Sequence, residues 1–213
     1  MALVFFILSP EYAADSLLPR LRKVIRDTLA LAPGGSASHT EEEIQKTNSE
    51  AMRLLAEILQ VANDAEVEGR SSKINHHAIV DAAGTLRRIA NQLSAIATGR
   101  ILTPLPQLDP ATESARQQVL NAIRRQLKTW LDFFNGAESL SATAARKMAQ
   151  AKSLHDLANP IDEFSSRLEG GPFAQMKSWT LEQRRAMLAE LQSMRQLESL
   201  FSELNQYMAD IPG

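Results

Sequence analysis

Residues 2–31 read ALVFFILSPEYAADSLLPRLRKVIRDTLAL, an apolar run followed by an amphipathic segment. The run from Ala2 to Leu8 has no polar side, so it predicts a segment that is surrounded by apolar groups, in a protein core or in lipid. From Leu17 to Leu31 large apolar residues recur every three or four positions, which predicts a helix with one buried stripe. The chain is therefore predicted to pass from a fully apolar segment directly into amphipathic helix.

Three interpretations of the apolar run stay open. It is shorter than the ~20 residues of helix that span a bilayer. No basic residue precedes it, and Ala13-Ala14 beside Tyr12 and Asp15 is a poor cleavage site, so the run does not fit a signal peptide. It is the end of a transmembrane helix that begins upstream, a segment buried in the core of this chain, or a monotopic anchor.

The charges beside the run favour the transmembrane interpretation. The following segment carries Arg20, Arg22, Lys23 and Arg26. Lysine and arginine near the end of a membrane helix mark its cytoplasmic side. We therefore predict two parts, an apolar stub at residues 1–9 and a soluble helical bundle at residues 10–213, with the four basic residues forming a membrane-proximal face.

Composition excludes several classes of function. The chain has 213 residues and a formal net charge of −2 from 23 basic and 25 acidic side chains. Nucleic acid is disfavoured as a partner, because phosphate-backbone binding needs a concentrated excess of lysine and arginine. The absence of cysteine rules out disulfides, thiolate nucleophiles and zinc sites built on cysteine.

Helix starts and stops divide the rest of the chain. The expected helices span about 10–31, 41–68, 72–102, 110–135, 141–158 and 180–209, with a short helical piece at about 161–168. Their expected starts are Ser9-Pro10, Thr40 with Glu43, Asp109-Pro110, and Thr180 with Gln183. Pro19 predicts a kink or a restart, and Asn159-Pro160 predicts a break. Because no segment alternates with period two, we predict an all-α fold without sheet, an elongated antiparallel bundle of about six helices.

The apolar stripes also predict which side chains face the core. They include Leu59, Ala144 and Leu188 among many leucines, isoleucines and alanines. Trp130, Phe133 and Phe134 form a cluster that is interpreted as a core plug in preference to a ligand pocket or a docking patch.

Few residues suggest chemistry. His77 and Asp81 lie one helical turn apart, downstream of Asp64, Glu66 and Glu68, and could offer metal ligands. A solvated helix start is the preferred interpretation, because this spacing is common by chance. No H-E-x-x-H, P-loop, G-x-G-x-x-G or G-x-S-x-G pattern occurs. We therefore predict no catalytic residue, no metal site and no cofactor.

Two arginine pairs are the remaining candidates. Arg87-Arg88 and Arg124-Arg125 lie on long predicted helices, where paired guanidinium groups could face an anionic partner. The alternative is a solvated helix surface with ion pairs one turn away.

The order of these features resembles a known family. The stretch Ser9 to Leu21, SPEYAADSLLPRL, is followed by a basic amphipathic helix, by Leu54-Leu55-Ala56-Glu57 and by the stretch Ala65 to Arg70, AEVEGR. This arrangement resembles the C-terminal soluble region of the fusaric acid resistance family, across all 213 residues. Family members often have tryptophan before the proline where this chain has Ser9.

The resemblance implies a place in the cell and a set of partners. The family consists of inner-membrane proteins related to aromatic acid exporters, in which transmembrane bundles alternate with cytoplasmic helical domains. It implies a non-catalytic domain of an efflux transporter for aromatic acids or drugs, on the cytoplasmic side of the bacterial inner membrane. Its partners would be the membrane surface, the transmembrane region of the same protein, further copies in a homo-oligomer, and a periplasmic adaptor subunit. No catalytic residue is carried over.

Two rival functions remain. The first is a free-standing soluble adaptor or regulatory bundle, in which residues 3–8 pack into the chain's own core. The second is an enzyme with a metal at His77 and Asp81.

Overall fold

A computed structural model describes residues 13–33, 40–67, 75–104, 107–136, 141–150, 157–170 and 178–212. These residues form seven helices and no strand, so the predicted all-α class is confirmed for them. The apolar run at residues 2–8 lies outside the described residues. The helices are α2 (Ala13–Leu31), α3 (Glu41–Val67), α4 (His76–Leu102), α5 (Pro110–Gly136), α6 (Ala142–Ala149), α8 (Ala158–Gly170) and α10 (Leu181–Asp210).

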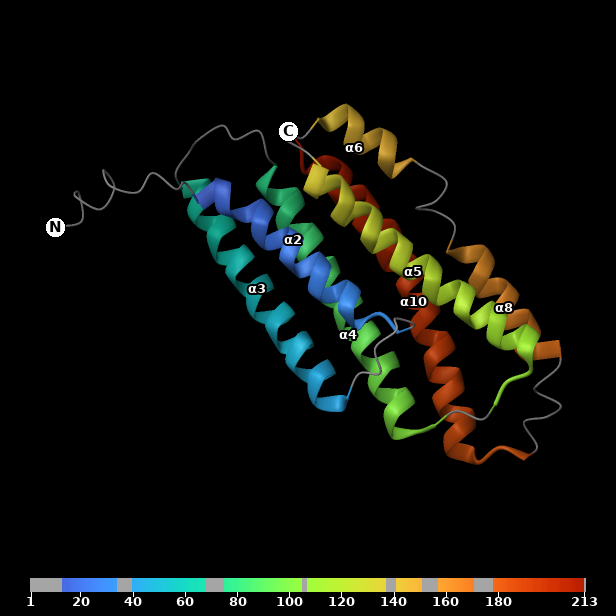
Figure 1. Ribbon diagram of the computed structural model, residues 1–213. Helices are drawn as coiled ribbons and strands as arrows, with labels where there is room; N and C mark the ends of the chain where they lie inside the picture. The colour runs from blue at the N-terminus through green and yellow to red at the C-terminus, as the bar shows by residue number, and fades with distance from the viewer. Residues whose placement is uncertain are drawn as a thin grey trace.

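The helices form an elongated bundle in which most neighbours run antiparallel (Figure 1). α3 packs between α2 and α4, and α4 packs in turn against α10. α5 lies across α2 on one side and α8 on the other, while α6 packs on α10. α3, α4 and α5 have 27 residues each, which corresponds to about 40 Å of helix. The predicted elongated antiparallel bundle is therefore confirmed, with the short piece after Asn159 counted as a seventh helix.

The helix starts follow the predicted caps. Thr40 and Glu43 form a reciprocal pair at the start of α3. The backbone nitrogen of Thr40 lies 2.8 Å from Oε2 of Glu43, and that of Glu43 lies 3.2 Å from Oγ1 of Thr40. Thr180 and Gln183 form the equivalent capping box at α10. At α5 the Asp109 Oδ1 atom accepts two backbone N–H groups of the first turn, at 3.0 and 3.1 Å. These side chains supply acceptors for N–H groups that have no partner within the helix.

The predicted restart at Pro19 and the predicted break at Pro160 are wrong. α2 continues through Pro19 as one helix, so it does not restart there. Pro19 is exposed, whereas Leu17 and Leu21 on either side are fully buried, so packing holds the helix together across the proline. Pro160 does not break a helix but lies in the first turn of α8, where a missing N–H costs little.

The helix predicted at about 141–158 is also shorter where it is described. α6 covers Ala142–Ala149, and residues 151–156 lie outside the described part of the chain.

The core is a continuous cluster of aliphatic side chains from every helix except α6, with an aromatic plug on α5. Trp130 and Phe134 are fully buried and stack with ring centroids 5.8 Å apart. The indole Nε1 of Trp130 donates to Oδ1 of the buried Asn205 on α10 at 2.7 Å. The core-plug interpretation is therefore confirmed for Trp130 and Phe134, while Phe133 is half-buried at the edge of the plug.

Three of the predicted inward positions are wrong. Leu59 and Leu188 are 39% and 48% exposed, and Ala144 is also exposed. At the last two positions the neighbouring residue takes the inward place: Met187 and Ala145 are fully buried. Each error concerns one residue at the edge of an apolar stripe. Sequence periodicity predicts that a helix has a buried face, but it predicts less accurately which residues lie at the edge of that face.

A buried carboxylate joins three helices at one end of the bundle. Glu190 of α10 is 5% exposed and lies between Arg100 of α4 and Arg116 of α5. Both Arg116 contacts, Nε to Oε1 and Nη2 to Oε2, measure 2.9 Å, so the pair is bidentate. Arg100 also donates through Nε and Nη2, with Nε 3.2 Å from Oε2. One carboxylate therefore receives four hydrogen bonds from two guanidinium groups.

These contacts keep the group ionised despite its burial. Burial raises the pKa of Glu190, but the hydrogen bonds from Arg100 and Arg116 outweigh it and hold the pKa below its ordinary value of 4.5. For Arg116, burial lowers the pKa and the bonds to Glu190 outweigh it. Removing Glu190 would leave Arg116 with only the partly exposed Glu113 as a counterion, 3.1 Å from its Nη1, and an undercompensated buried charge costs more than the pair contributes when intact.

We predict that Glu190→Gln lowers the free energy of unfolding by about 3 kcal/mol, because buried Arg116 would keep only the partly exposed Glu113, 3.1 Å away, as a counterion. Urea denaturation followed by circular dichroism measures the change. Glu198→Gln, an exposed position on the same helix, is the matched control and is expected to change stability by no more than about 0.5 kcal/mol.

The stabilisation that Glu190 provides also depends on pH. A carboxyl with a lowered folded-state pKa contributes stability that is fully present above its unfolded pKa and is lost as the pH falls through the folded value. The difference between the wild type and Glu190→Gln is therefore expected to narrow below about pH 4.5. A difference that stays constant with pH would contradict the role assigned to this carboxylate.

Candidate functional site: the charged sides of α2

The four basic residues predicted to face a membrane divide between two sides of α2. Arg20 and Lys23 lie toward α3, and both form ion pairs with it. Arg22 and Arg26, one turn apart, form no ion pair within the part of the chain that the structure describes. The predicted single basic face is therefore two surfaces of different electrostatic character.

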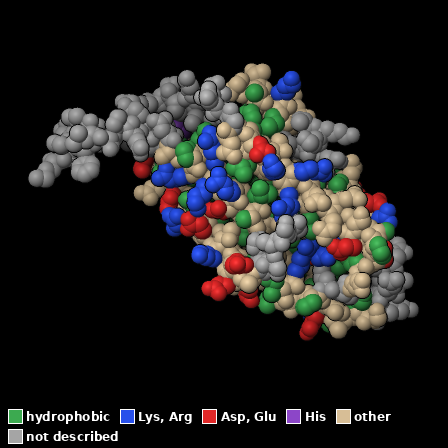
Figure 2. Space-filling model, in the orientation of Figure 1, with side chains coloured by type: hydrophobic (Ala, Val, Ile, Leu, Met, Phe, Trp, Pro, Cys, Tyr) green, Lys and Arg blue, Asp and Glu red, His purple; other side chains and the backbone are tan. Residues whose placement is uncertain are grey.

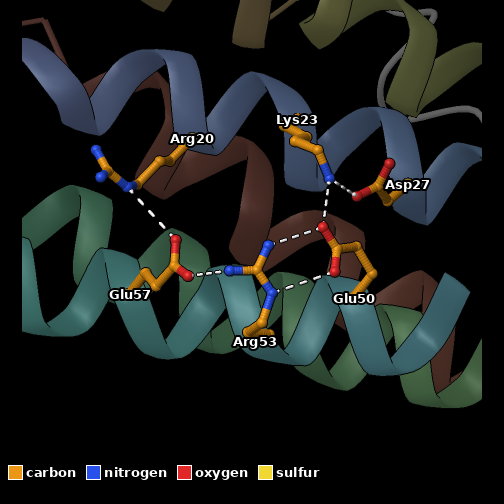
Figure 3. A network of polar contacts seen from close by, with 6 residues as sticks. All are labelled: Arg20, Lys23, Asp27, Glu50, Arg53 and Glu57. Carbon is orange, nitrogen blue, oxygen red and sulfur yellow. Dashed lines mark hydrogen bonds and ion pairs between the residues drawn. The ribbon is translucent and has the colours of Figure 1, made fainter. Parts of the chain in front are cut away.

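Lys23 connects the two helices through carboxylates (Figure 3). Its Nζ is 2.9 Å from Oε1 of Glu50 on α3 and 3.1 Å from Oδ2 of Asp27 on α2. The bonds to Glu50 raise the pKa of Lys23, against a smaller opposing effect of burial, and Asp27 adds to the rise. The positive charge of Lys23 is therefore compensated by one carboxylate from each helix.

The network continues along α3 through Arg53 (Figure 3). Arg53 donates to both oxygens of Glu50, at 2.8 and 3.2 Å, and pairs with Glu57 one turn away. Glu57 is in turn 3.7 Å from the guanidinium Nε of Arg20 on α2. Six alternating charges thus form one chain across the α2–α3 contact, namely Arg20, Lys23, Asp27, Glu50, Arg53 and Glu57.

The centre of this network is Glu50. Hydrogen bonds from Arg53 and then from Lys23 lower the pKa of Glu50 from 4.5 to about 2. The group is on the surface, so salt screens these contacts and their contribution to stability is small. Their stabilising effect is present above about pH 4.5 and is lost as the pH falls toward about 2.

Sequence reasoning named Arg20 and Lys23 as cations of a membrane-proximal face and did not predict their pairing with α3. Glu50, Arg53 and Glu57 follow an i, i+3, i+7 spacing that could have indicated an ion-paired helix face. Nothing in the sequence indicates that α2 supplies Lys23 and Arg20 to that face. That pairing depends on the way the two helices pack.

Arg22 and Arg26 remain available on the other side of α2. Arg22 is half-buried, and its Nε atom is shielded from solvent without a hydrogen-bond partner. Arg26 is exposed. Among the described residues, these two members of the predicted basic face have no carboxylate partner.

The other predicted candidates are spread over the surface. Arg88 of the first arginine pair is bound to Glu203 of α10 and to the Thr85 hydroxyl, 3.1 Å away. His77 and Asp81 lie exposed near the start of α4. Within the described ranges, no three histidine or acidic side chains gather as metal ligands would. None of the described helices combines the length and the apolar character needed to cross a bilayer.

Comparison with known proteins gives no family for the chain. No protein family model, no curated protein and no solved structure matches it. The resemblance to the fusaric acid resistance family therefore remains a prediction from the quoted residues.

We predict that Arg53→Gln raises the pKa of Glu50 more than Lys23→Gln does, because Arg53 provides the larger of the two stabilising hydrogen bonds. Carboxyl carbon NMR titration of the two variants measures both shifts. The wild-type carboxyl is expected to titrate near pH 2. A wild-type midpoint near the ordinary value of 4.5 would show that the network does not persist in solution.

Proposed function

We propose that this chain is a non-catalytic helical domain of a membrane efflux transporter, lying on the cytoplasmic side of the inner membrane. Its transported compounds would be aromatic acids or drugs, as the family resemblance implies. The domain would contact the membrane surface and the transmembrane region of its own protein. The whole transporter would assemble as a homo-oligomer and would bind a periplasmic adaptor subunit on the other side of the membrane.

The observation that supports this proposal is the order of an apolar run, the start of α2, and the cations Arg22 and Arg26 on the same helix. α2 begins at Ala13, at one end of the bundle (Figure 1). In the sequence, the apolar run ends at Leu8, five residues before Ala13. Arg22 and Arg26 lie about 14 and 20 Å beyond Ala13 along the same helix, without ion pairs to the described residues. Cations placed shortly after an apolar segment are attracted to anionic headgroups by about 1 kcal/mol each.

The described core supports the same proposal from a second direction. Residues 16–31 already bury their apolar stripe against α3, α4 and α5, with Leu17, Leu21, Val24 and Ile25 fully buried. The bundle therefore closes its own interior around α2. An apolar segment attached at the end of α2 is then suited to an environment other than this core.

We expect that deleting residues 1–9 leaves the helical content and the urea midpoint unchanged and abolishes binding of the chain to vesicles. Circular dichroism and vesicle flotation measure the two results. A free-standing adaptor predicts the reverse, because each large apolar side chain withdrawn from a core costs about 1.5 to 3 kcal/mol. A coding sequence without membrane spans upstream of Met1 would also contradict the transporter proposal.

We further expect that Arg22→Gln combined with Arg26→Gln weakens binding to phosphatidylglycerol vesicles by about 2 kcal/mol, one for each lost charge. Flotation at low and high salt measures the loss, which should shrink as salt screens the attraction. Arg20→Gln combined with Lys23→Gln is the matched control, because those cations are already paired with Glu57, Glu50 and Asp27. Equal losses in the two variants would contradict the division of α2 into two surfaces.

A further inference from the structure

A basic cleft lies between α2, α5 and α8, away from the α2–α3 network. It has a volume of about 650 Å³. Its described lining consists of Leu29, Gln118, Asn121, Arg124, Arg125, Lys128 and Pro160. Figure 2 shows lysine and arginine side chains gathered over α2 and α5 on this face.

The charge balance of the cleft sets it apart from the rest of the surface. Its described lining contains three cations and two amide side chains, and no aspartate or glutamate. The whole chain carries more acidic than basic residues, and on the α2–α3 face each of Arg20, Lys23 and Arg53 has a carboxylate partner. A concentration of positive charge in a hollow of a slightly acidic protein indicates a site for an anion.

The three cations of the cleft differ from one another in their contacts. Arg124 is half-buried, and its Nη1 donates to the Ala32 carbonyl oxygen at 3.1 Å, which fixes the side chain between α5 and the end of α2. Arg125 is exposed and forms no ion pair with the residues that the structure describes. Lys128 pairs with Asp132 on its own helix at 2.7 Å, an exposed contact that contributes little and is easily exchanged.

The spacing on α5 aligns these groups into one stripe. Gln118, Asn121, Arg125 and Lys128 follow at intervals of three and four residues, so their side chains project from one side of the helix. Amide N–H groups and guanidinium groups donate hydrogen bonds to oxygen anions, and guanidinium does so in a planar, bidentate way. The stripe is therefore a row of donors along one wall.

The opposite wall adds a second favourable element. Pro160 is in the first turn of α8, so the N-terminal end of this 13-residue helix borders the cleft. The dipole at a helix N-terminus favours negative charge. Leu29 and Pro160 supply apolar surface for the organic part of a ligand.

We propose that this cleft binds a phosphate monoester, with Arg125 and Lys128 as its main charge partners and Arg124 as the anchored third cation. A monoester carries nearly two negative charges at neutral pH, which suits three cations of which one is shared with Asp132. The ligand is either the headgroup of an anionic lipid or a soluble phosphate ester. The inference does not depend on the membrane attachment proposed above, because a soluble ligand would bind the isolated chain.

The test uses the full chain and two probes. Phenyl phosphate represents the soluble ester, and phosphatidylcholine vesicles with phosphatidic acid as the minority lipid represent the headgroup. Titration followed by the Nε–Hε NMR signals of Arg124 and Arg125 is expected to show saturable binding of at least one probe. Binding of phenyl phosphate alone assigns a soluble ligand. Because residues 1–9 are themselves proposed to bind vesicles, vesicle binding assigns a lipid to the cleft only if it shifts the Arg124 and Arg125 signals and does so also in the chain that lacks residues 1–9. Failure of both probes would overturn the proposal.

Variants separate the cleft from general charge effects. Arg125→Gln combined with Lys128→Gln is expected to weaken binding of the positive probe by about tenfold or more, through the loss of two charge-assisted hydrogen bonds. The matched control, Arg87→Gln with Lys46→Gln, removes one arginine and one lysine from exposed positions elsewhere and should leave binding unchanged. Asn121→Glu keeps both cations, adds a negative charge in the cleft, and should also weaken binding.

Two further results would contradict the assignment. The first is an equal loss of affinity in the control variant, which would show attraction by net charge alone. The second is benzoate binding as tightly as phenyl phosphate, which would show that the cleft accepts any single carboxylate. Circular dichroism of each variant verifies that the fold is intact before the titrations are compared.

Discussion

The arrangement of the bundle depends on one buried carboxylate. Glu190 comes from the last helix, whereas its partners Arg100 and Arg116 come from the end of α4 and the beginning of α5, which are consecutive in the chain. An aliphatic core resists slippage weakly, since apolar contacts have no direction. Four hydrogen bonds to one carboxylate can be made in only one register, so they fix the position of α10 along α4 and α5.

A second directional contact fixes α10 further along its length. Trp130 donates to Asn205, which lies four turns beyond Glu190 on α10, and the two contacts together fix α5 and α10 at two heights. Between these two residues α10 buries Met194, Leu197 and Phe201. The apolar burial supplies most of the stabilisation, and the polar contacts select which of several similar packings forms.

The charged residues on the surface are compensated on one side of α2 and gathered with like charges on another. On the α2–α3 side cations and carboxylates alternate, so little net charge faces the solvent. On the α2–α5–α8 side Arg124, Arg125 and Lys128 gather around a cleft whose described lining has no carboxylate. Of two residues adjacent in the sequence, Lys23 pairs with Glu50 and Asp27, whereas Arg22 has no ion pair among the described residues. The proposed membrane contact and the proposed phosphate site both rest on cations without a carboxylate partner from another helix in the described part of the chain.

The sequence by itself determined the class of the fold, the helix starts at Thr40, Asp109 and Thr180, and the burial of Trp130 and Phe134. These features depend on local spacing and on capping chemistry within three or four residues, which the sequence displays directly. Only the tertiary structure decided that Lys23 is neutralised by Glu50, that Glu190 is buried between two arginines, and that Arg124-Arg125 borders a cleft. Each of these depends on which helices become neighbours and at what rotation, because a charged residue at the edge of a helix face is solvated, paired or gathered with like charges according to the helix beside it.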